Sequence, residues 1–496
     1  MYNEPVYYNL IYEYFTLRFH FQYYRYGDML PSVETLRRDF CVSAQTVKNT
    51  MKRLHAEGYI TTDRLRYKVI FQQSPKERND FIRGFLSERT AAMSDLIQST
   101  TAIFSGMIIH GLRRMEKEDI KQLSVFADRM DADDIICFFY IILKKAGNPL
   151  ALNLYWETAI FVGFSLFDCN RKHGFLNEIL FRQELEKIVG YIQENDTVSA
   201  YNSIRRFQDE LLKGISQYEK QHRTFAQTAA PRSFVWRLYH DRPQRCYSLA
   251  LWFLHHIYMG DYQDVQYLPS YQKMAEITDT SVSTVRRTVS LLSRLGVVRP
   301  DNGKGIRIFS GNTLACTSDL SDSSVRNIMI YFFQAFELVT YSCRTVTLLT
   351  LEKLTAEERE KLIMDLETFS WAGLYENAFW CYLICITRHC PLAAVREVYR
   401  KIYCLFLLGH ALKLSFVATD RTDAEIKSLS ETMIKHLKNG DFHGFAESVA
   451  AFTQTELPIT EKFMTASGFK PEELHPSQSI RLILSDRFIP NRDYLP

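Results

Sequence analysis

One segment of this chain occurs twice, and this repeat constrains the fold more than any other feature. Residues 30–71 align with residues 268–309 without a gap. The matched pairs include Leu30 with Leu268, Ser43 with Ser281, Val47 with Val285, Leu54 with Leu292, and Gly58 with Gly296. Self-similarity at one long spacing indicates a duplicated module. We therefore expect two copies of one small domain in this chain.

Each copy has the pattern of two helices joined by a tight turn. Pro31 and Ser32 suit the start of the first helix, because proline needs no hydrogen-bond partner there and serine is a good N-cap. After a break at residues 41–43, the apolar residues Val47, Met51 and Leu54 recur at the spacing of a helix with one buried face. The second copy repeats this stripe.

A hairpin is expected after the second helix of the first copy. Gly58 is placed to end that helix, and residues 59–62 and 67–71 have the composition of two short strands around a turn at 63–66. An aromatic-rich helix is expected before the module at residues 4–25, with residues 245–259 as its counterpart. We expect Leu10, Tyr14, Leu17 and Phe21 to pack in the core. A helix-turn-helix with a wing sets its second helix in a DNA major groove.

These motifs resemble the GntR family of bacterial winged-helix transcription regulators. The shared elements are the Leu-Pro-Ser start, Ser-x-x-Thr-Val-Lys/Arg at the second helix, the later Leu-x-x-x-Gly, and the wing residues 303–305, Gly-Lys-Gly, of the second copy. The family's arginine after the helix-opening serine is replaced by Ala44 and Val282, and its Glu-Arg after Leu-Pro-Ser is also absent. The resemblance covers about a third of the chain. It implies a winged-helix fold and DNA binding, but not the family's sequence preference.

Positive charge is concentrated in the repeated modules. The chain has a formal net charge of +3. Residues 18–68 carry ten Lys or Arg against five acidic residues, and residues 232–310 carry eleven against six. The rest of the chain is therefore net acidic, and the surplus cations lie where contact with phosphates would need them.

The segments between and after the modules predict helices throughout. We expect a mainly α fold with two winged helix-turn-helix domains, each followed by an all-helical domain. The expected boundaries are 1–74 and 75–225 for the first pair, 232–312 and 322–470 for the second pair, and 471–496 for a C-terminal tail. The polar stretch 221–233 is expected to be the linker between the two halves.

The helical segments also resemble, at residues 145–149 and 440–441, the ligand-binding domain of one GntR subfamily. That domain typically holds a metal with an Asp and several His. The positions where those ligands would fall are Ile135, Phe139, Asn377 and Cys381, which cannot form such a set. We therefore expect an architectural likeness, with no metal and no cofactor.

Other sequence features argue against an enzyme or a membrane protein. The chain lacks a phosphate-cradling Gly-Lys-Ser/Thr loop, a His-Glu-x-x-His motif and a Gly-x-Ser-x-Gly elbow. Cys381, Cys385 and His389 fall near one helical face and Cys390 follows them, but they lie in a mostly apolar run where packing is expected. The ten scattered cysteines, the short apolar runs and the absence of a signal-peptide pattern at the start favour a cytoplasmic protein with reduced thiols.

The candidate DNA-binding residues follow from helical periodicity and from the positions of the wings. Polar residues opposite the buried stripe face outward, and Gln or Asn can pair with adenine and Arg with guanine. Wing cations suit phosphate or minor-groove contacts. In the first copy the candidates are Ser32, Arg37, Arg38, Ser43, Ala44, Gln45, Thr46, Lys48, Asn49, Lys52, Arg64, Arg66 and Lys68. In the second copy they are Ser270, Ser281, Val282, Ser283, Thr284, Arg286, Arg287, Lys304 and Arg307.

These observations predict a DNA-binding transcription regulator with two GntR-like winged helices in one chain. Its partner would be double-stranded DNA, and its helical domains are where a small-molecule effector would bind. The chain would act as a monomeric pseudo-dimer or as a homodimer. Two alternatives remain: a protein-interaction scaffold with degenerate winged helices, and a plasmid replication initiator, a class that can also join two winged helices.

Overall fold

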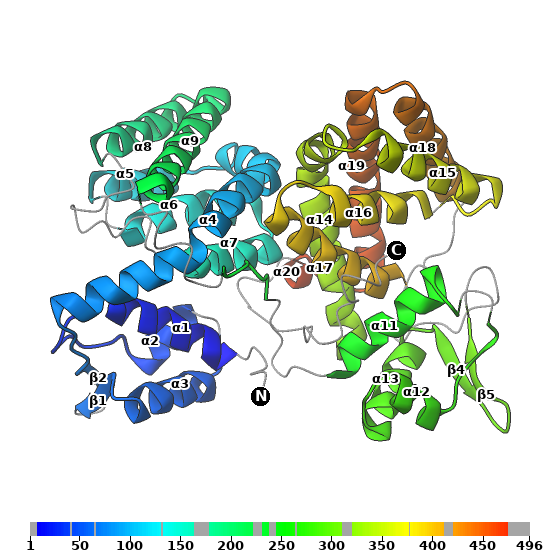
Figure 1. Ribbon diagram of the computed structural model, residues 1–496, viewed down its shortest axis with the longest axis horizontal. Coiled ribbons are helices and arrows are strands. Elements are labelled where there is room, and N and C mark those ends of the chain that lie inside the picture. Colours follow the sequence, from blue (N-terminus) through cyan, green and yellow to red (C-terminus); the bar gives the residue numbers. More distant parts are fainter. Residues whose placement is uncertain are drawn as a thin grey trace.

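The expectation of a mainly helical fold is confirmed by the computed structural model (Figure 1). It describes residues 7–39, 42–63, 66–129, 132–162, 178–221, 231–237, 245–262, 265–309, 320–375, 377–410 and 420–474. The described strands form one two-stranded and one three-stranded sheet. Among the described helices, none is both long and apolar enough to cross a bilayer.

The N-terminal unit, residues 7–71, is built from three helices and a hairpin. Its elements are α1 (Tyr7–His20), α2 (Val33–Asp39), α3 (Ala44–Ala56), β1 (Ile60–Asp63) and β2 (Arg66–Val69). The two strands are antiparallel, with Ile60 opposite Val69. Most buried apolar residues of this unit form a small hydrophobic core that also includes Ile160, whereas Phe21 belongs to the main core of the protein.

Helix α1 differs from the expected helix in length and in its buried side. It ends at His20 rather than near residue 25, because Gln22 adopts a left-handed conformation with φ of 59°. Ile11, Phe15 and Phe19 are fully buried. Of the four residues expected in the core, Leu10 and Phe21 are buried, whereas Tyr14 and Leu17 are only partly buried.

The central unit, residues 245–309, has the same order of helices and hairpin. Its elements are α11 (Arg245–Met259), β3 (Tyr267–Leu268), α12 (Tyr271–Ile277), α13 (Val282–Arg294), β4 (Val298–Asp301) and β5 (Gly305–Ile308). Strand β3, which the sequence pattern does not predict, pairs with β5 and makes the hairpin a three-stranded sheet. In the N-terminal unit a single bridge between Met29 and Lys68 occupies the corresponding place.

The first helical block, residues 75–221, follows the N-terminal unit directly. Ser74 and Glu77 form a capping box at the start of its long first helix, and Pro75 occupies the first turn, where its missing N–H costs nothing. The helices are α4 (Pro75–Leu112), α5 (Lys117–Arg129), α6 (Ala132–Ala146), α7 (Pro149–Val162), α8 (Glu178–Gln193) and α9 (Thr197–Gln221).

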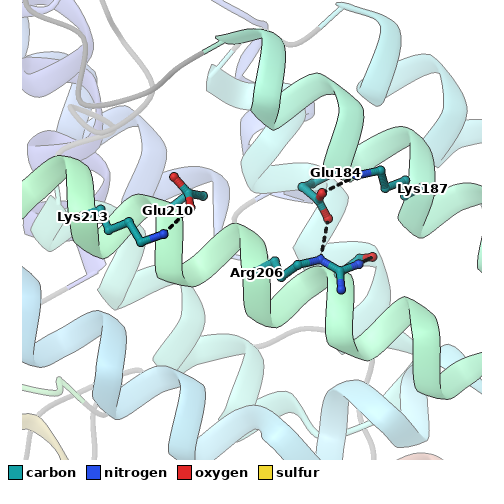
Figure 2. Close-up of polar contacts among 6 residues, drawn as sticks. Glu184, Lys187, Arg206, Glu210 and Lys213 are labelled. Carbon is teal, nitrogen blue, oxygen red and sulfur yellow. Dashed lines mark hydrogen bonds and ion pairs between the residues drawn. The ribbon is translucent and has the colours of Figure 1, made fainter.

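Helices α8 and α9 pack side by side at the outer end of this block, and ion pairs lie along them (Figure 2). Glu184 on α8 accepts hydrogen bonds from Lys187 at 2.7 Å and from Arg206 on α9 at 3.2 Å. Lys213 pairs with Glu210 one turn earlier on α9. Such exposed pairs contribute less than about 1 kcal/mol each, so apolar packing holds the two helices together.

The second helical block, residues 323–474, follows the central unit. Its helices are α14 (Ser323–Leu351), α15 (Ala356–Trp371), α16 (Asn377–His389), α17 (Ala393–His410), α18 (Asp420–Lys438), α19 (Phe442–Ala466) and α20 (Pro471–Leu474). The start of the expected C-terminal tail is thus a short helix that packs on α14: Leu474 is fully buried, and its carbonyl accepts a hydrogen bond from Gln334. Residues 475–496 lie outside the described part of the chain.

The two helical blocks pack against each other reciprocally. Helix α4 of the first block contacts α14 and α17 of the second, while α14 contacts α7 of the first. At the crossing of α4 and α14, Gly106 lies so close to the backbone of Tyr341 that a Cβ atom would stand 2.5 Å from the Tyr341 carbonyl oxygen. The blocks therefore meet through direct backbone contact at this point.

Acidic side chains hold the starts of α7 and α17 from the opposite block. Asp95 on α4 accepts hydrogen bonds from the backbone N–H groups of Ala393 and Ala394, at 2.6 and 2.7 Å. Glu337 on α14 accepts one from Asn148, whose side chain also caps α7. A carboxylate of each block therefore accepts hydrogen bonds at the start of a helix in the other block, directly from the backbone in one direction and from the capping Asn148 side chain in the other.

Residues 232–237, which the expected boundary assigns to the second winged helix, contact helices outside the central unit. Trp236 is fully buried and donates a hydrogen bond from its indole nitrogen to Asn153 on α7 at 2.7 Å. Arg237 bridges Glu157 on α7 and Glu13 on α1, each at 2.8 Å. The backbone N–H of Trp236 also donates to Glu397 on α17 at 3.2 Å, so this segment contacts helices of both helical blocks before the central unit begins.

Candidate nucleic-acid interface

Helix α3 presents one buried and one exposed face. Val47, Met51 and Leu54 are fully buried, as the periodicity predicts. The Ser43 side chain caps the helix by accepting a hydrogen bond from the N–H of Thr46. The candidates on the opposite side are exposed or half-exposed, and the described residues leave that face uncovered: Ala44, Gln45, Thr46, Lys48, Asn49 and Lys52.

Helix α13 has the same arrangement in the central unit. Val285, Val289 and Leu292 are buried, and Ser281 caps the helix by accepting a hydrogen bond from the N–H of Thr284. The outward candidates are again exposed or half-exposed: Val282, Ser283, Thr284, Arg286 and Arg287. Figure 1 shows α3 and α13 at the same lower edge of the molecule, each below the helical block that follows it.

The two outer faces differ chemically. On α3, Gln45 donates a side-chain hydrogen bond to Asn49 at 2.9 Å, so these amides already form a pair one turn apart. On α13, the Arg286 guanidinium lies 5.9 Å from the ring centre of Tyr271 on α12. An amide-rich face and an arginine-rich face suit different base edges.

The candidates around α2 are placed mainly by local contacts. Ser32 caps α2 by accepting a hydrogen bond from the N–H of Thr35, and Ser270 caps α12 through Lys273 in the same way. Arg37 is exposed and paired with Glu34 on the same helix. The side chain of Arg38 and all of Arg64 lie outside the described residues.

The wings carry the remaining candidates. In the N-terminal unit, Arg66 is exposed and Lys68 half-buried on β2. In the central unit, Gly303 and Gly305 adopt positive φ of 74° and 112° and turn the chain between β4 and β5, with exposed Lys304 between them. Arg307 on β5 is half-buried, with its guanidinium 5.5 Å from the ring centre of Phe309.

A groove beside α13 contains residues that are not among the candidates expected from the sequence. It encloses about 420 Å³ and is lined by Tyr271, Arg286, Ser290, Arg294 and Pro300 among others. The sequence spacing could have identified Ser290 and Arg294 as neighbours of Arg286, because residues 286, 290 and 294 share one face of α13. Arg294 also pairs with Asp322 at 2.7 Å, so the groove adjoins the start of the second helical block.

The cysteine-rich stretch of α16 is packed in the core, as expected. Cys381, Cys385 and Cys390 are buried, and burial raises the thiol pKa of Cys381 and of Cys385 to about 12. His389 instead pairs with Glu358 at 2.9 Å. Thiols held in the neutral form are poor nucleophiles and poor metal ligands. Within the described ranges, no cluster of three or more His, Cys, Asp or Glu side chains could hold a metal ion.

The first helical block encloses a small apolar pocket between its helices. It has a volume of about 110 Å³ and is lined by Phe104, Ile136, Phe139, Tyr155 and Phe207 among others. Burial holds the Tyr155 pKa far above its usual range, and its hydroxyl donates to the Ile136 carbonyl. Pockets for drug-sized ligands usually enclose about 300–1,000 Å³, so this one would admit only a very small apolar molecule.

Comparison with known proteins finds likeness only among solved structures. No model of a protein family matches this chain, and no curated protein sequence matches it. A GntR protein of Streptococcus agalactiae is 17% identical, with 43% of this chain and 99% of that chain covered at a TM-score of 0.20. McbR/YncC of E. coli is 13% identical, with 43% and 98% covered at a TM-score of 0.22.

A third solved structure is Lar, which controls expression of the agr system of Listeria monocytogenes. It is 14% identical, with 44% of this chain and 97% of that chain covered at a TM-score of 0.22. The identities and TM-scores of all three structures are too low to assign this chain to a family.

Proposed function

We propose that this chain is a sequence-specific DNA-binding transcription regulator that contacts duplex DNA through both α3 and α13. The observation that carries this proposal is the exposed polar face of each helix, opposite a fully buried stripe. Gln45, Lys48 and Asn49 project from α3, and Arg286 and Arg287 from α13. A recognition helix needs this geometry, because its inner face must hold the unit together while its outer face reaches base edges.

The reciprocal packing of the helical blocks supports a monomer that works as a pseudo-dimer. The first helices of the two blocks, α4 and α14, contact each other. Helix α4 also contacts α17 of the second block, and α14 contacts α7 of the first. Covalent linkage makes the second DNA contact intramolecular and raises its effective concentration. This benefit requires the two recognition helices to lie about 34 Å apart along the duplex, or a multiple of that distance.

The experiment is DNA footprinting of the full chain on the region around its own gene, followed by titration at several salt concentrations. Lys48→Ala and Arg286→Ala should each weaken binding and lower the salt dependence by about one released counterion. Lys213→Ala is the matched control, because Lys213 is an exposed cation on α9 that pairs with Glu210. It should leave binding unchanged.

The alternatives predict different results in the same experiment. A protein-interaction scaffold would show weak, sequence-independent DNA binding that neither Lys48→Ala nor Arg286→Ala alters. A replication initiator would protect repeats at an origin rather than a promoter. Binding that is salt-insensitive and unchanged in both variants would overturn the proposal.

A further inference from the structure

The groove beside α13 in the central unit combines positive charge with hydrogen-bond donors. It encloses about 420 Å³ and extends along α13 to the last residue of that helix. Its charged lining residues are Arg286 and Arg294, and Ser290 adds a hydroxyl group between them. Tyr271 at the start of α12 and Pro300 on β4 form other parts of its wall. No carboxylate is among the described residues that line the groove.

The two arginines differ in their partners. Arg294 donates from Nη1 to Asp322 at 2.7 Å and from Nε to the Ser290 carbonyl at 3.4 Å. A guanidinium has five N–H donors, so these two contacts leave donors for a further acceptor. Arg286 forms no ion pair with any residue in the described part of the chain. The groove therefore keeps a net positive charge even after Asp322 is counted.

The surroundings of the groove are also positively charged. Residues 265–309 carry seven Lys or Arg against three acidic residues. Asp301 pairs with Arg299 at 3.5 Å. Glu276 pairs with Lys273 at 3.4 Å. An anion that approaches the groove is therefore attracted by the field of the whole unit and not only by one side chain.

The position of the groove along α13 suits the backbone of DNA better than a base edge. In helix-turn-helix proteins the residues near the start of the recognition helix contact the bases. Arg294 is the last residue of α13 and lies eight residues after Arg286, which corresponds to about 12 Å along the helix. The groove thus extends from the part of the helix that would contact bases to its far end, where a bound duplex presents phosphates.

The N-terminal unit has basic residues along the same side of α3. Lys48 and Lys52 are exposed, and Lys48 aligns with Arg286 of the central unit. Neither lysine forms an ion pair with a residue that the structure describes. Each unit thus places a second cation further along this helix: Lys52 lies one turn later on α3, and Arg294 lies two turns later on α13. Both units therefore offer positive charge beyond the first turns of the helix.

We propose that the groove beside α13 binds a segment of the sugar–phosphate backbone of duplex DNA through Arg286, Ser290 and Arg294. The inference rests on the proposed DNA binding and adds Ser290 and Arg294 to the residues that contact the duplex. A guanidinium matches two phosphate oxygens with parallel hydrogen bonds, and a serine hydroxyl donates another. Arg294 also holds Asp322, whose side chain caps α14, so the bound backbone lies directly beside the start of the second helical block.

The test uses duplexes in which one backbone phosphate of the footprinted site is replaced by a neutral methylphosphonate. At the contacted position this replacement should weaken binding of the wild-type chain about tenfold, because charge-assisted hydrogen bonds are lost. Arg294→Gln should weaken binding of the unmodified duplex by a similar factor, and the methylphosphonate should then cost this variant less than about twofold. Arg344→Gln is the matched control, because Arg344 on α14 is an exposed arginine that also pairs with a carboxylate, Glu447.

Ser290 provides a second test that leaves both arginines in place. Its side chain is exposed, so substitution leaves the buried face of α13 intact, and circular dichroism checks this. Ser290→Lys introduces the residue that α3 has at this position, and it should tighten binding and raise the salt dependence by about one released counterion. Ser290→Glu should weaken binding at least about tenfold, because the carboxylate attracts the arginines and repels phosphate.

Inorganic phosphate distinguishes a backbone contact from a site for a free anion. It should weaken DNA binding no more than sodium chloride of equal ionic strength does. Competition by phosphate beyond that level, no methylphosphonate position at which Arg294→Gln removes the loss, or equal affinity of Ser290→Lys and Ser290→Glu would overturn this inference while DNA binding by α3 and α13 stands. Absence of any footprint would overturn both proposals.

Discussion

Asn148 donates a hydrogen bond to the Glu337 carboxylate at 2.8 Å and thereby joins the start of α7 to α14 of the other helical block. The same amide group donates to the Gln334 carbonyl at 2.9 Å, and its oxygen accepts from the N–H of Ala151. Asn148 is fully buried. One side chain therefore caps a helix and fastens the two halves of the chain together.

We expect Asn148→Ala to lower the free energy of unfolding by about 3 kcal/mol, because it leaves buried polar groups on both blocks without their partner. Asn148→Asp keeps the capping oxygen but loses the donor and sets a second carboxylate beside Glu337, so it should be at least as damaging. Ser43→Ala, which removes an exposed cap, should cost only about 1 kcal/mol. Urea denaturation measures all three, and a wild-type stability for Asn148→Asp would contradict this interpretation.

Gly106→Ala should destabilise the protein by about 2–3 kcal/mol through overpacking. The added methyl group would stand 2.5 Å from the Tyr341 carbonyl oxygen, so α4 and α14 would have to separate. Gly190→Ala on α8 is the matched control, since nothing lies within 4 Å of its Cβ position. Because alanine favours helix more than glycine, the control should gain up to about 1 kcal/mol. Similar thermal midpoints for both variants would argue against close contact at this crossing.

Mild acid should weaken the fold through its partly buried histidines. Burial, followed by Arg114 and Arg113, lowers the pKa of His110 below 6.5, and burial also lowers the pKa values of His20 and His256. Below pH 6.5 the unfolded chain takes up protons before the folded chain does, so stability falls until pH reaches the folded-state pKa values. Each pKa unit of difference corresponds to about 1.4 kcal/mol at most.

His110→Asn should reduce this pH dependence, because it removes one of the three groups. Denaturation at pH 7.5, 6.5 and 5.5 measures the slope. The carboxylates with lowered pKa, such as Glu184, add their own losses only below pH 4.5, outside this window. A slope that stays the same after all three histidines are replaced would refute the assignment.

If α3 and α13 contact DNA as we propose, the two helices should prefer different bases. Gln45→Ala should relax the preference for adenine in the half-site contacted by α3, and Arg287→Ala the preference for guanine in the half-site contacted by α13. Each substitution should reduce the difference in binding free energy between the preferred base and the other bases by about 1–3 kcal/mol. Selection of bound sequences from a random DNA pool measures this. A perfectly palindromic preferred site, altered identically by both variants, would rule out separate readout.

Local signals in the sequence predicted the helices α3 and α13, because buried stripes and capping serines act within a few residues of each other. Val47, Met51 and Leu54 lie one helical turn apart, and the contact between Ser43 and Thr46 spans a single turn. The same reasoning located most of the other helices. It missed β3, because a two-residue strand carries almost no pattern of its own.

Only the tertiary structure shows which helices residues 232–237 pack against and which helices form the contact between the two blocks. The polar composition of residues 221–233 predicts a linker, yet Trp236, just beyond this stretch, is buried and donates a hydrogen bond to Asn153 on α7. The close approach of Gly106 to Tyr341 likewise joins segments far apart in sequence. Such contacts depend on how whole helices pack, and periodicity within one helix shows which face is buried but not which partner covers it.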